Sequence, residues 1–187
     1  MEDRTRKMGV RKRKRAGAAA LFLVTVLWLA AAPLTASAAG MGVGDSVPSL
    51  SLRAAEGGVY DLRAELETGP VLLAFVSPKC TPCRESRPVL DRVARAYGPA
   101  CGLSIVSVLL GYGPASSDPE LPTSERLLQG DEAMAQAYGV FGTPVFYLVG
   151  RNGTVLWKHV GRLVAGPAER ALDDAIDAEL AATALAR

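Results

Sequence analysis

Residues 75–84 read FVSPKCTPCR, and this stretch decides the fold because it joins an apolar run to two cysteines, Cys80 and Cys83. The run at 71–76, VLLAFV, is apolar at every position, which indicates a short strand buried on both faces. Beyond the cysteines, apolar residues recur at helical spacing: Val89, Leu90, Val93, Ala94 and Tyr97. The cysteine pair is therefore expected where a buried strand ends and a helix begins.

Further along the chain, two more apolar stretches extend the sheet. Residues 103–110 (LSIVSVLL) predict a second central strand, which should lie parallel to the first because a helix joins the two. Residues 145–149 (VFYLV) and 155–160 predict a hairpin, since Asn152-Gly153 between them supplies the positive φ angles of a tight turn. A last helix is expected from about Pro167.

The remaining segments are less regular. Residues 111–122 are rich in Gly, Pro and Ser, which predicts a loop, and residues 124–138 are expected to hold one or two short helices around Gly130. Residues 59–62 (VYDL) alternate in polarity and predict one arm of an N-terminal hairpin. The pattern as a whole is that of an α/β domain.

The first 38 residues have the layout of an export signal. A basic run ends in RKRKR at 11–15, an uncharged stretch of 17 residues follows at 16–32, and the small-residue site Ala36-Ser37-Ala38 comes next. Roughly 17 to 25 apolar residues span a bilayer, so cleavage after about Ala38 and retention as a membrane anchor are both open. In either case, the positive-inside rule places the chain after Gly40 on the extracytoplasmic, or periplasmic, side of the membrane.

This layout gives three parts: a signal peptide or signal anchor at 1–38, a flexible tether at 39–49, and one folded domain at 50–187. Positions 1–15 hold eight of the 21 Lys and Arg residues but only two of the 19 acidic residues. The exported part is therefore acidic, and the basic run is explained by membrane topology. No nucleic-acid partner is expected.

Four features, in this order, carry a family resemblance: GDSVP at 44–48, the C-x-x-C at 80–83, Gly142-Thr143-Pro144, and the Asn152-Gly153 turn. With them the chain resembles thioredoxin-like proteins, in particular exported thiol-disulfide oxidoreductases of the TlpA type and of cytochrome maturation. The resemblance implies a thioredoxin-like fold, with a central mixed sheet flanked by helices and an extra N-terminal β-hairpin. It also implies a cis bond before Pro144 and a redox-active disulfide as the only redox group.

The motif departs from the usual family pattern at three places. Lys79 stands where a tryptophan usually precedes the first cysteine, and the Ser-Pro-x-Cys form is similar to the methylamine-utilisation disulfide-isomerase-like branch. Ala74 stands where many thioredoxins carry a buried acid. Ser86 stands where related proteins place a glutamate, with Glu85 one step early. The identity of a proton acceptor is therefore open.

Cys80 and Cys83 are the candidate catalytic residues. Exchange needs a thiolate that attacks a disulfide and a second thiol that releases the mixed intermediate. Cys80 at a helix N-terminus, beside Lys79, has the surroundings that lower a cysteine pKa, so it is expected to be the nucleophile. Cys83, one turn further, is expected to be the resolving thiol.

Four further residues are expected to support the site. Thr81 and Pro82, between the cysteines, should tune the potential, and Pro82 is tolerated because first-turn N–H groups have no helical partner. Thr143 should offer its backbone to an extended substrate, and Pro144 should keep the groove open. The plainer interpretation of Gly142-Thr143-Pro144 is ordinary loop punctuation.

Several alternatives compete with the redox interpretation. A zinc site would need Cys80, Cys83, Cys101 and His159, but the last two lack a paired spacing, so no metal is expected. A purely structural Cys80-Cys83 disulfide would close too short a loop to stabilise the fold much. A thiol peroxidase of the same fold and a non-catalytic binding module are the other two. Cys101, just before a strand, is expected to be a small core residue, with oxidation or pairing with a partner as the alternative, and His159 is expected to be a surface residue.

The sequence thus predicts an exported thiol-disulfide oxidoreductase that cycles Cys80-Cys83 between dithiol and disulfide. The resemblance favours a disulfide reductase for exported proteins that receives electrons from a membrane thiol-disulfide donor. An isomerase or oxidase role is the alternative, and the N-terminal segment would hold the protein at the membrane if it is not cleaved.

Overall fold

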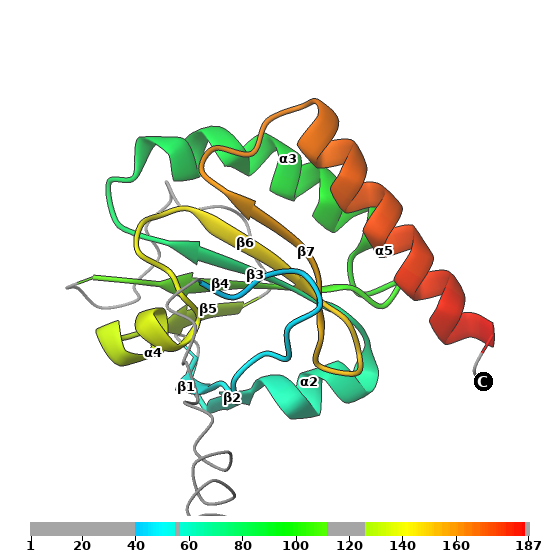
Figure 1. The fold of residues 1–187 in the computed structure, drawn as a ribbon, viewed down its shortest axis with the longest axis horizontal. Helices are drawn as coiled ribbons and strands as arrows, with labels where there is room; N and C mark the ends of the chain where they lie inside the picture. Colours follow the sequence, from blue (N-terminus) through cyan, green and yellow to red (C-terminus); the bar gives the residue numbers. More distant parts are fainter. Residues whose placement is uncertain (1–39, 55–56, 112–125, 186–187) are drawn as a thin grey trace, which may run out of the picture. The chain divides into compact units, whose positions relative to one another are not determined.

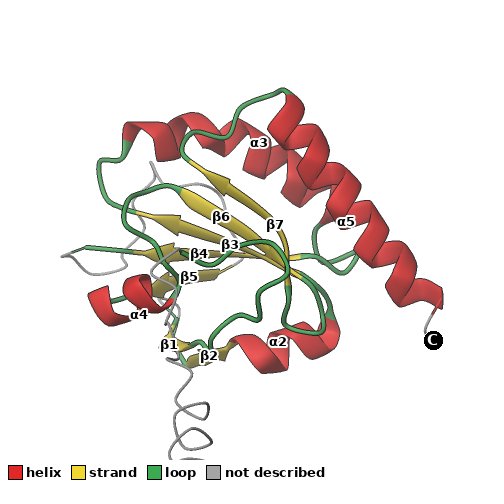
Figure 2. Cartoon of the chain, in the orientation of Figure 1, coloured by secondary structure: helices red, strands yellow, loops and turns green. Residues whose placement is uncertain are grey.

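The computed structural model describes residues 40–54, 57–111 and 126–185 (Figure 1). Its centre is a five-stranded sheet in the order β5-β4-β3-β6-β7 (Figure 2). The strands are β3 (Val71–Val76), β4 (Ser104–Leu109), β5 (Arg126–Gln129), β6 (Val145–Val149) and β7 (Val155–Val160). The expected signal segment at 1–38 and most of the expected loop at 111–122 lie outside the described residues.

Strand β3 is the middle of the sheet and sets its mixed character. It runs parallel to β4, with Val71 opposite Ser104, and antiparallel to β6, with Phe75 opposite Val145. All six residues of β3 are buried, because helices cover both of its faces. The predictions of a buried strand at 71–76, a parallel neighbour at 103–110 and a C-terminal hairpin are confirmed.

Alternate residues of β3 serve two separate apolar clusters, because successive strand side chains point to opposite faces. Leu72, Ala74 and Val76 pack with the long helices α3 (Thr81–Tyr97) and α5 (Pro167–Leu185). Arg92 of α3 forms ion pairs with Glu169 and Asp173 of α5. The two helices on this face are thus joined by charge as well as by apolar contact.

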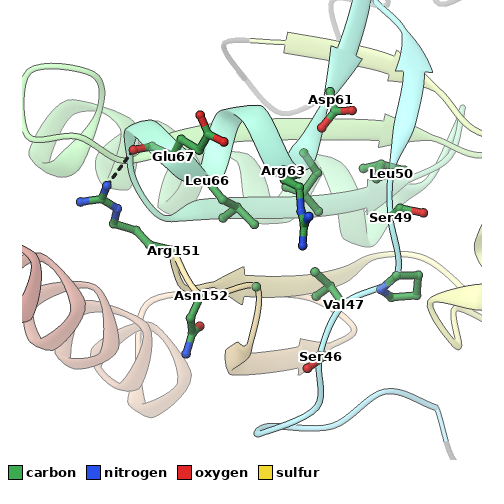
Figure 3. A pocket seen from close by; sticks show the side chains of 13 residues that line it. Ser46, Val47, Ser49, Leu50, Asp61, Arg63, Leu66, Glu67, Arg151 and Asn152 are labelled. Carbon is green, nitrogen blue, oxygen red and sulfur yellow. Dashed lines mark hydrogen bonds between the residues drawn. The ribbon is translucent and has the colours of Figure 1, made fainter.

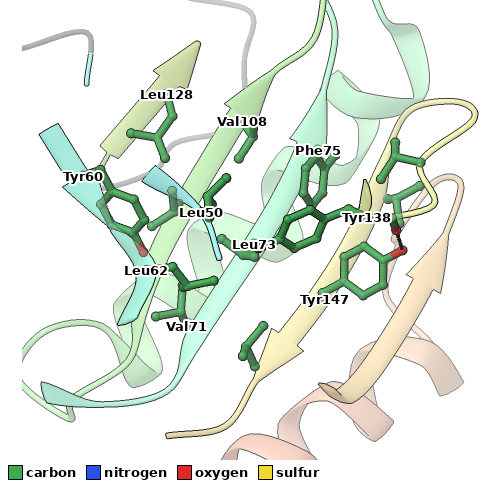
Figure 4. Packing of buried hydrophobic residues seen from close by; sticks show 14 of the residues in the cluster. Leu50, Tyr60, Leu62, Val71, Leu73, Phe75, Val108, Leu128, Tyr138 and Tyr147 are labelled. Atoms are coloured by element: carbon green, nitrogen blue, oxygen red, sulfur yellow. Dashed lines mark hydrogen bonds between the residues drawn. The ribbon is translucent and has the colours of Figure 1, made fainter. Parts of the chain in front are cut away.

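The opposite face of the sheet holds the aromatic cluster drawn in Figure 4. The ring of Phe75 lies 5.1 Å from that of Tyr138 and 5.9 Å from that of Tyr147, and the Tyr147 hydroxyl donates to the Tyr138 carbonyl at 2.8 Å. Burial raises the pKa of Tyr147 to about 12 and raises the pKa values of Tyr138 and Tyr60 as well. Helices α2 (Leu62–Thr68) and α4 (Glu132–Ala137) complete this face.

The expected N-terminal hairpin is present. Strands β1 (Ser51–Arg53) and β2 (Val59–Asp61) pair antiparallel, with Leu52 opposite Tyr60. Asp61 then begins α2, where its carboxylate accepts from the Ala64 N–H at 3.1 Å. The expected strand residue Leu62 is therefore the first residue of a helix.

Two segments differ from the sequence prediction. Of the one or two short helices expected at 124–138, α4 is present, but Arg126–Gln129 forms β5, a parallel edge strand beside β4. Four residues are too short for a helical or strand period to appear, and pairing with β4 decides the conformation. Helix α2 was not predicted, because its seven residues place only Leu62 and Leu66 in the core.

The structure also differs from the expected flexible tether at 39–49. From residue 40 onward the segment lies along the β6-β7 turn and β7: the Gly44 N–H donates to the Val155 carbonyl at 2.8 Å and the Val47 N–H to the Gly153 carbonyl at 2.9 Å. The Met41 side chain is buried in the core. Small and polar composition predicted mobility here, whereas backbone pairing with an exposed strand edge supplies order. No helix in the described ranges is long and apolar enough to cross a bilayer.

Candidate active site

Cys80 and Cys83 lie at the carboxyl end of β3, where α3 begins. They form a disulfide with their Cα atoms 5.2 Å apart. Cys80 is the residue that caps α3, and its Sγ accepts from the Cys83 N–H at 3.2 Å. Cys80 is half-buried, whereas Cys83 is fully buried against the sheet. Of the two sulfurs, that of Cys80 is the one a protein partner can reach.

A tight turn delivers the chain from β3 to the helix. The Cys80 N–H donates to the Ser77 carbonyl at 3.3 Å, which closes a β-turn with Pro78 and Lys79 at its centre. Lys79 has a φ of 59°, the left-handed value that a type II turn requires at this position. Its side chain is exposed and stands directly beside the first cysteine.

The loop before β6, the antiparallel neighbour of β3, reaches the cysteine pair. The Thr143-Pro144 peptide bond is cis, as the resemblance implies. Because Val145 pairs with Phe75, this loop meets the end of β3. The Thr143 hydroxyl donates to Cys80 Sγ at 3.7 Å and lies 2.7 Å from the Ser77 hydroxyl. The Thr143 hydroxyl thus adjoins the Cys80 sulfur, and the Ser77 hydroxyl lies behind it.

Thr81 and Pro82 form the exposed first turn of α3. The Thr81 hydroxyl accepts from the Arg84 guanidinium at 3.0 Å. Pro82 costs the helix no hydrogen bond, because first-turn N–H groups have no partner within the helix. Its carbonyl accepts from the Ser86 hydroxyl at 2.7 Å. The predicted supporting residues are thus gathered around the cysteine pair.

Ser86 is a supporting residue that the sequence reasoning treated only as a missing glutamate. It is fully buried, and besides donating to Pro82 it accepts from the Leu163 N–H at 2.9 Å. It therefore ties the first turns of α3 to the loop that follows β7. The available signal was its position, because residue 86 falls on the same helical stripe as Val89, Leu90 and Val93.

Glu85 and Ala74 are the two positions near the motif at which the sequence left a proton acceptor open. Glu85 forms an exposed ion pair with Arg162 at 3.1 Å, so it points to the surface. Ala74, where a buried acid could stand, is fully buried among apolar residues. The polar groups that contact the Cys80 sulfur in the described residues are therefore the Cys83 N–H and the Thr143 hydroxyl.

The expectation that Cys101 is a small core residue is wrong. It is a free and exposed cysteine on the turn before β4, where its thiol lies 3.5 Å from the Ala96 carbonyl. Ser104 pairs with Val71 at the start of β3, so Cys101 and Cys80 lie at opposite ends of a strand about 16 Å long. A disulfide between them is excluded, since bridged Cα atoms lie about 4.4 to 6.8 Å apart.

His159 lies on β7, whose other edge has no strand partner in the described sheet. Its ring stacks on Trp157 and Phe146, with centroids 5.8 and 6.3 Å away, and its Nε2 lies 3.0 Å from the Arg162 carbonyl. Within the described ranges, no three His, Cys, Asp or Glu side chains are grouped as metal ligands would be.

A pocket of about 650 Å³ lies away from the cysteines (Figure 3). Its walls are the segment 46–50, helix α2 and the β6-β7 turn, where the Arg151 guanidinium donates to the Glu67 carbonyl at 2.7 Å. That turn follows Val149, which pairs with Val71 at the start of β3. The pocket is thus at the end of the sheet opposite to the disulfide.

Comparison with known proteins places this geometry among redox proteins. No family model matches the chain. The thioredoxin-like protein YneN of Bacillus subtilis is 24% identical over 140 residues, which cover 72% of this chain and 81% of that protein. The thiol:disulfide interchange protein CycY of Rhizobium leguminosarum bv. viciae is 31% identical over 124 residues, or 63% of this chain and 62% of CycY.

Among solved structures, one designated as a thiol:disulfide interchange protein DsbE from Chlorobium tepidum has a TM-score of 0.65. It is 30% identical, and the match covers 75% of this chain and 99% of that one. The likeness thus extends over nearly the whole of the Chlorobium chain. With its C-x-x-C pair at a helix start beside a cis-proline, the chain belongs to the thioredoxin-like thiol:disulfide interchange proteins.

Proposed function

We propose that Cys80 and Cys83 are the catalytic pair and that the protein acts as a disulfide reductase for exported proteins. The observation that carries the proposal is the unequal burial of the two sulfurs. Cys80 is half-buried and caps α3, and Cys83 is fully buried one turn later. A partner disulfide can therefore approach Cys80, while the buried Cys83 can act only in the second step, as the resolving thiol.

In the reductive direction, the Cys80 thiolate attacks one sulfur of the substrate disulfide. A mixed disulfide forms, and the other substrate sulfur leaves as a thiolate that takes a proton from water. Cys83 then loses its proton and attacks Cys80 Sγ, which forms the Cys80–Cys83 disulfide and releases the second substrate thiol. Two electrons pass from the pair to the substrate, and a donor dithiol must return them.

The substrate chemistry fits an extended, apolar protein segment. Thr143 precedes the cis-proline, where its backbone can pair with a passing chain. Phe141, two residues before Thr143, is 81% exposed, and Val160 at the end of β7 and Val164 in the loop that follows it are also exposed. An unfolded disulfide-containing protein carries the apolar side chains that such a rim would contact.

The reductase direction, the export of the domain and its membrane donor rest on the family resemblance and the N-terminal sequence. Residues 1–38 have the layout of an export signal, and an exported reductase needs electrons from across the membrane. A membrane thiol-disulfide carrier is therefore the proposed donor, and the N-terminal segment is a membrane anchor if it is retained.

The redox midpoint of the pair tests the direction. The purified domain would be equilibrated with dithiothreitol or glutathione buffers, and its thiols trapped and counted. A value near or below about −270 mV, where thioredoxin lies, supports a reductase, whereas a value near −120 to −180 mV would overturn this direction in favour of an oxidase or isomerase. Absence of a reversible pair would remove the redox role altogether.

Single cysteine variants test the roles within the pair. Cys80→Ser should abolish exchange with a disulfide substrate, and Cys83→Ser should accumulate mixed disulfides that non-reducing gels detect. Cys101→Ser is the matched control and should exchange at the normal rate, because Cys101 lies at the far end of the sheet. Equal trapping by the Cys80 and Cys83 variants would contradict the assignment.

A further inference from the structure

Two hydroxyl groups form a short chain that ends on the reactive sulfur. The Ser77 hydroxyl lies 2.7 Å from the Thr143 hydroxyl, and the Thr143 hydroxyl donates to Cys80 Sγ at 3.7 Å. Ser77 and Thr143 are 66 residues apart in the sequence, and both are half-buried. Ser77 does not itself contact the sulfur, so any effect it has must pass through Thr143.

The number of hydrogens fixes the direction of this chain. A threonine hydroxyl carries one hydrogen, and while Thr143 donates it to Cys80 Sγ it can only accept from Ser77. Ser77 must therefore be the donor in the 2.7 Å contact. Hydrogen bonds in series polarise one another, so a donor behind Thr143 makes the Thr143 hydroxyl a stronger donor.

We propose that Ser77 is a positioning residue that orients and polarises Thr143 so that the Thr143 hydroxyl stabilises the Cys80 thiolate. This inference rests on the proposed role of Cys80 as the attacking thiol. In the disulfide the sulfur is a weak acceptor, which agrees with the long 3.7 Å contact. Once reduced, the sulfur carries the negative charge that attracts both the Thr143 hydroxyl and the Cys83 N–H.

Two neighbouring residues that could otherwise influence the Cys80 thiolate, Ala74 and Lys79, leave room for an effect of the hydroxyl chain. Ala74, on the strand beneath the pair, contributes no charge, and the exposed Lys79 ammonium is screened by water and salt. Ser77 is also held in place by the backbone, because its carbonyl accepts from the Cys80 N–H within the same turn. The position of Ser77 is therefore fixed relative to Cys80 by this backbone hydrogen bond.

The pH profile of Cys80 alkylation tests the proposal. The fully reduced protein would be treated with iodoacetamide at several pH values, and mass spectrometry would follow labelling at Cys80. Ser77→Ala should raise the Cys80 pKa, so that labelling below that pKa slows by about two- to tenfold, the range of one net hydrogen bond. The redox midpoint should become more negative, because the reduced form loses stabilisation.

Three further variants separate positioning from general disturbance. Ser77→Thr keeps the hydroxyl and should restore the profile, and Ser77→Ala should add nothing in a Thr143→Val background, because the chain is already broken. Ser104→Ala is the matched control: its half-buried hydroxyl donates to Glu65 at the far end of the sheet, and its profile should not change.

Failure of this inference is distinguishable from failure of the proposed function. If the wild-type protein exchanges disulfides but Ser77→Ala keeps its pH profile and midpoint, the inference alone is overturned. An equal loss from Ser77→Ala with and without the Thr143 hydroxyl would also overturn it. If wild-type Cys80 titrates as an ordinary cysteine and no exchange occurs, both proposals fall.

Discussion

Lys79 shows, at the scale of one residue, how the turn that positions the cysteines is held. Its φ of 59° lies in the left-handed region, where a side chain crowds the backbone and residues other than Gly, Asn and Asp are uncommon. Pro78 before it has a fixed φ that suits the preceding position of a type II turn. The bond from the Cys80 N–H to the Ser77 carbonyl closes the turn around this strained residue.

Substitution of Lys79 should therefore change stability in a way that depends on backbone preference. Lys79→Asn should be more stable than Lys79→Gln by about 0.5 to 1 kcal/mol, because asparagine tolerates the left-handed region better. Both variants remove the same charge, so their difference isolates the backbone effect. Urea unfolding of the oxidised proteins measures it, and equal midpoints would show that Lys79 is not strained.

At the scale of the element, helix α3 is tied to its surroundings by polar as well as apolar contacts. The buried Ser86 hydroxyl donates to the Pro82 carbonyl and accepts from the Leu163 N–H, so it links the cysteine-bearing turn to the chain after β7. Ser107 of β4 is equally buried, but its hydroxyl has no hydrogen-bond partner among the described residues. The two serines form a natural comparison.

Removal of these two hydroxyls should have opposite consequences. Ser86→Ala leaves the Leu163 N–H without its partner and should destabilise the protein by about 1 to 3 kcal/mol. Ser107→Ala removes a buried polar group that lacks a partner and should be neutral or stabilising. Thermal or urea unfolding of both variants checks this. A similar loss from both would mean that hydrogen bonding does not distinguish the two sites.

At the scale of the whole molecule, the sheet divides the core into two clusters of different chemistry. The face toward α3 and α5 is mainly aliphatic, with Cys83 at its edge. The other face buries three tyrosines, Tyr60, Tyr138 and Tyr147, whose pKa values are raised by burial. Ionisation of these phenols is compatible with the unfolded chain but opposes the folded one.

Stability should therefore fall at alkaline pH. The pKa of Tyr147 is about 12 in the folded protein, against about 10 for a free phenol, so its contribution is complete below about pH 10 and is lost as the pH rises toward 12. The linked loss for this residue is about 2 to 3 kcal/mol. Urea unfolding from pH 8 to 12 measures it.

Tyr147→Phe provides the comparison. It should be less stable at neutral pH by about 1 kcal/mol, because the bond to the Tyr138 carbonyl is lost. Its stability should decline less steeply between pH 10 and 12, because one titrating phenol has been removed. Identical slopes for the two proteins would contradict a raised Tyr147 pKa.

By itself, the sequence was sufficient to predict the elements with a strong local signal. The six apolar residues of β3, the parallel strand β4, the Asn152-Gly153 hairpin and helix α3 each follow from patterns within one segment. The same patterns put the cysteines at a strand-to-helix junction. Short segments gave no such signal: α2 was not predicted. The helices expected at 124–138 include α4 but not residues 126–129, which form β5 because pairing with β4 selects the conformation of a four-residue run.

Only the tertiary structure decided which groups surround the Cys80 sulfur. Pairing of β3 with β6 brings Ser77 to Thr143 across 66 residues, and the chain after β7 brings Leu163 to Ser86 across 77. It also placed Cys101 on an exposed turn at the far end of the sheet. Local patterns reflect the periodicity of a single segment, whereas these contacts depend on strand order and register, which arise only when distant segments pack together.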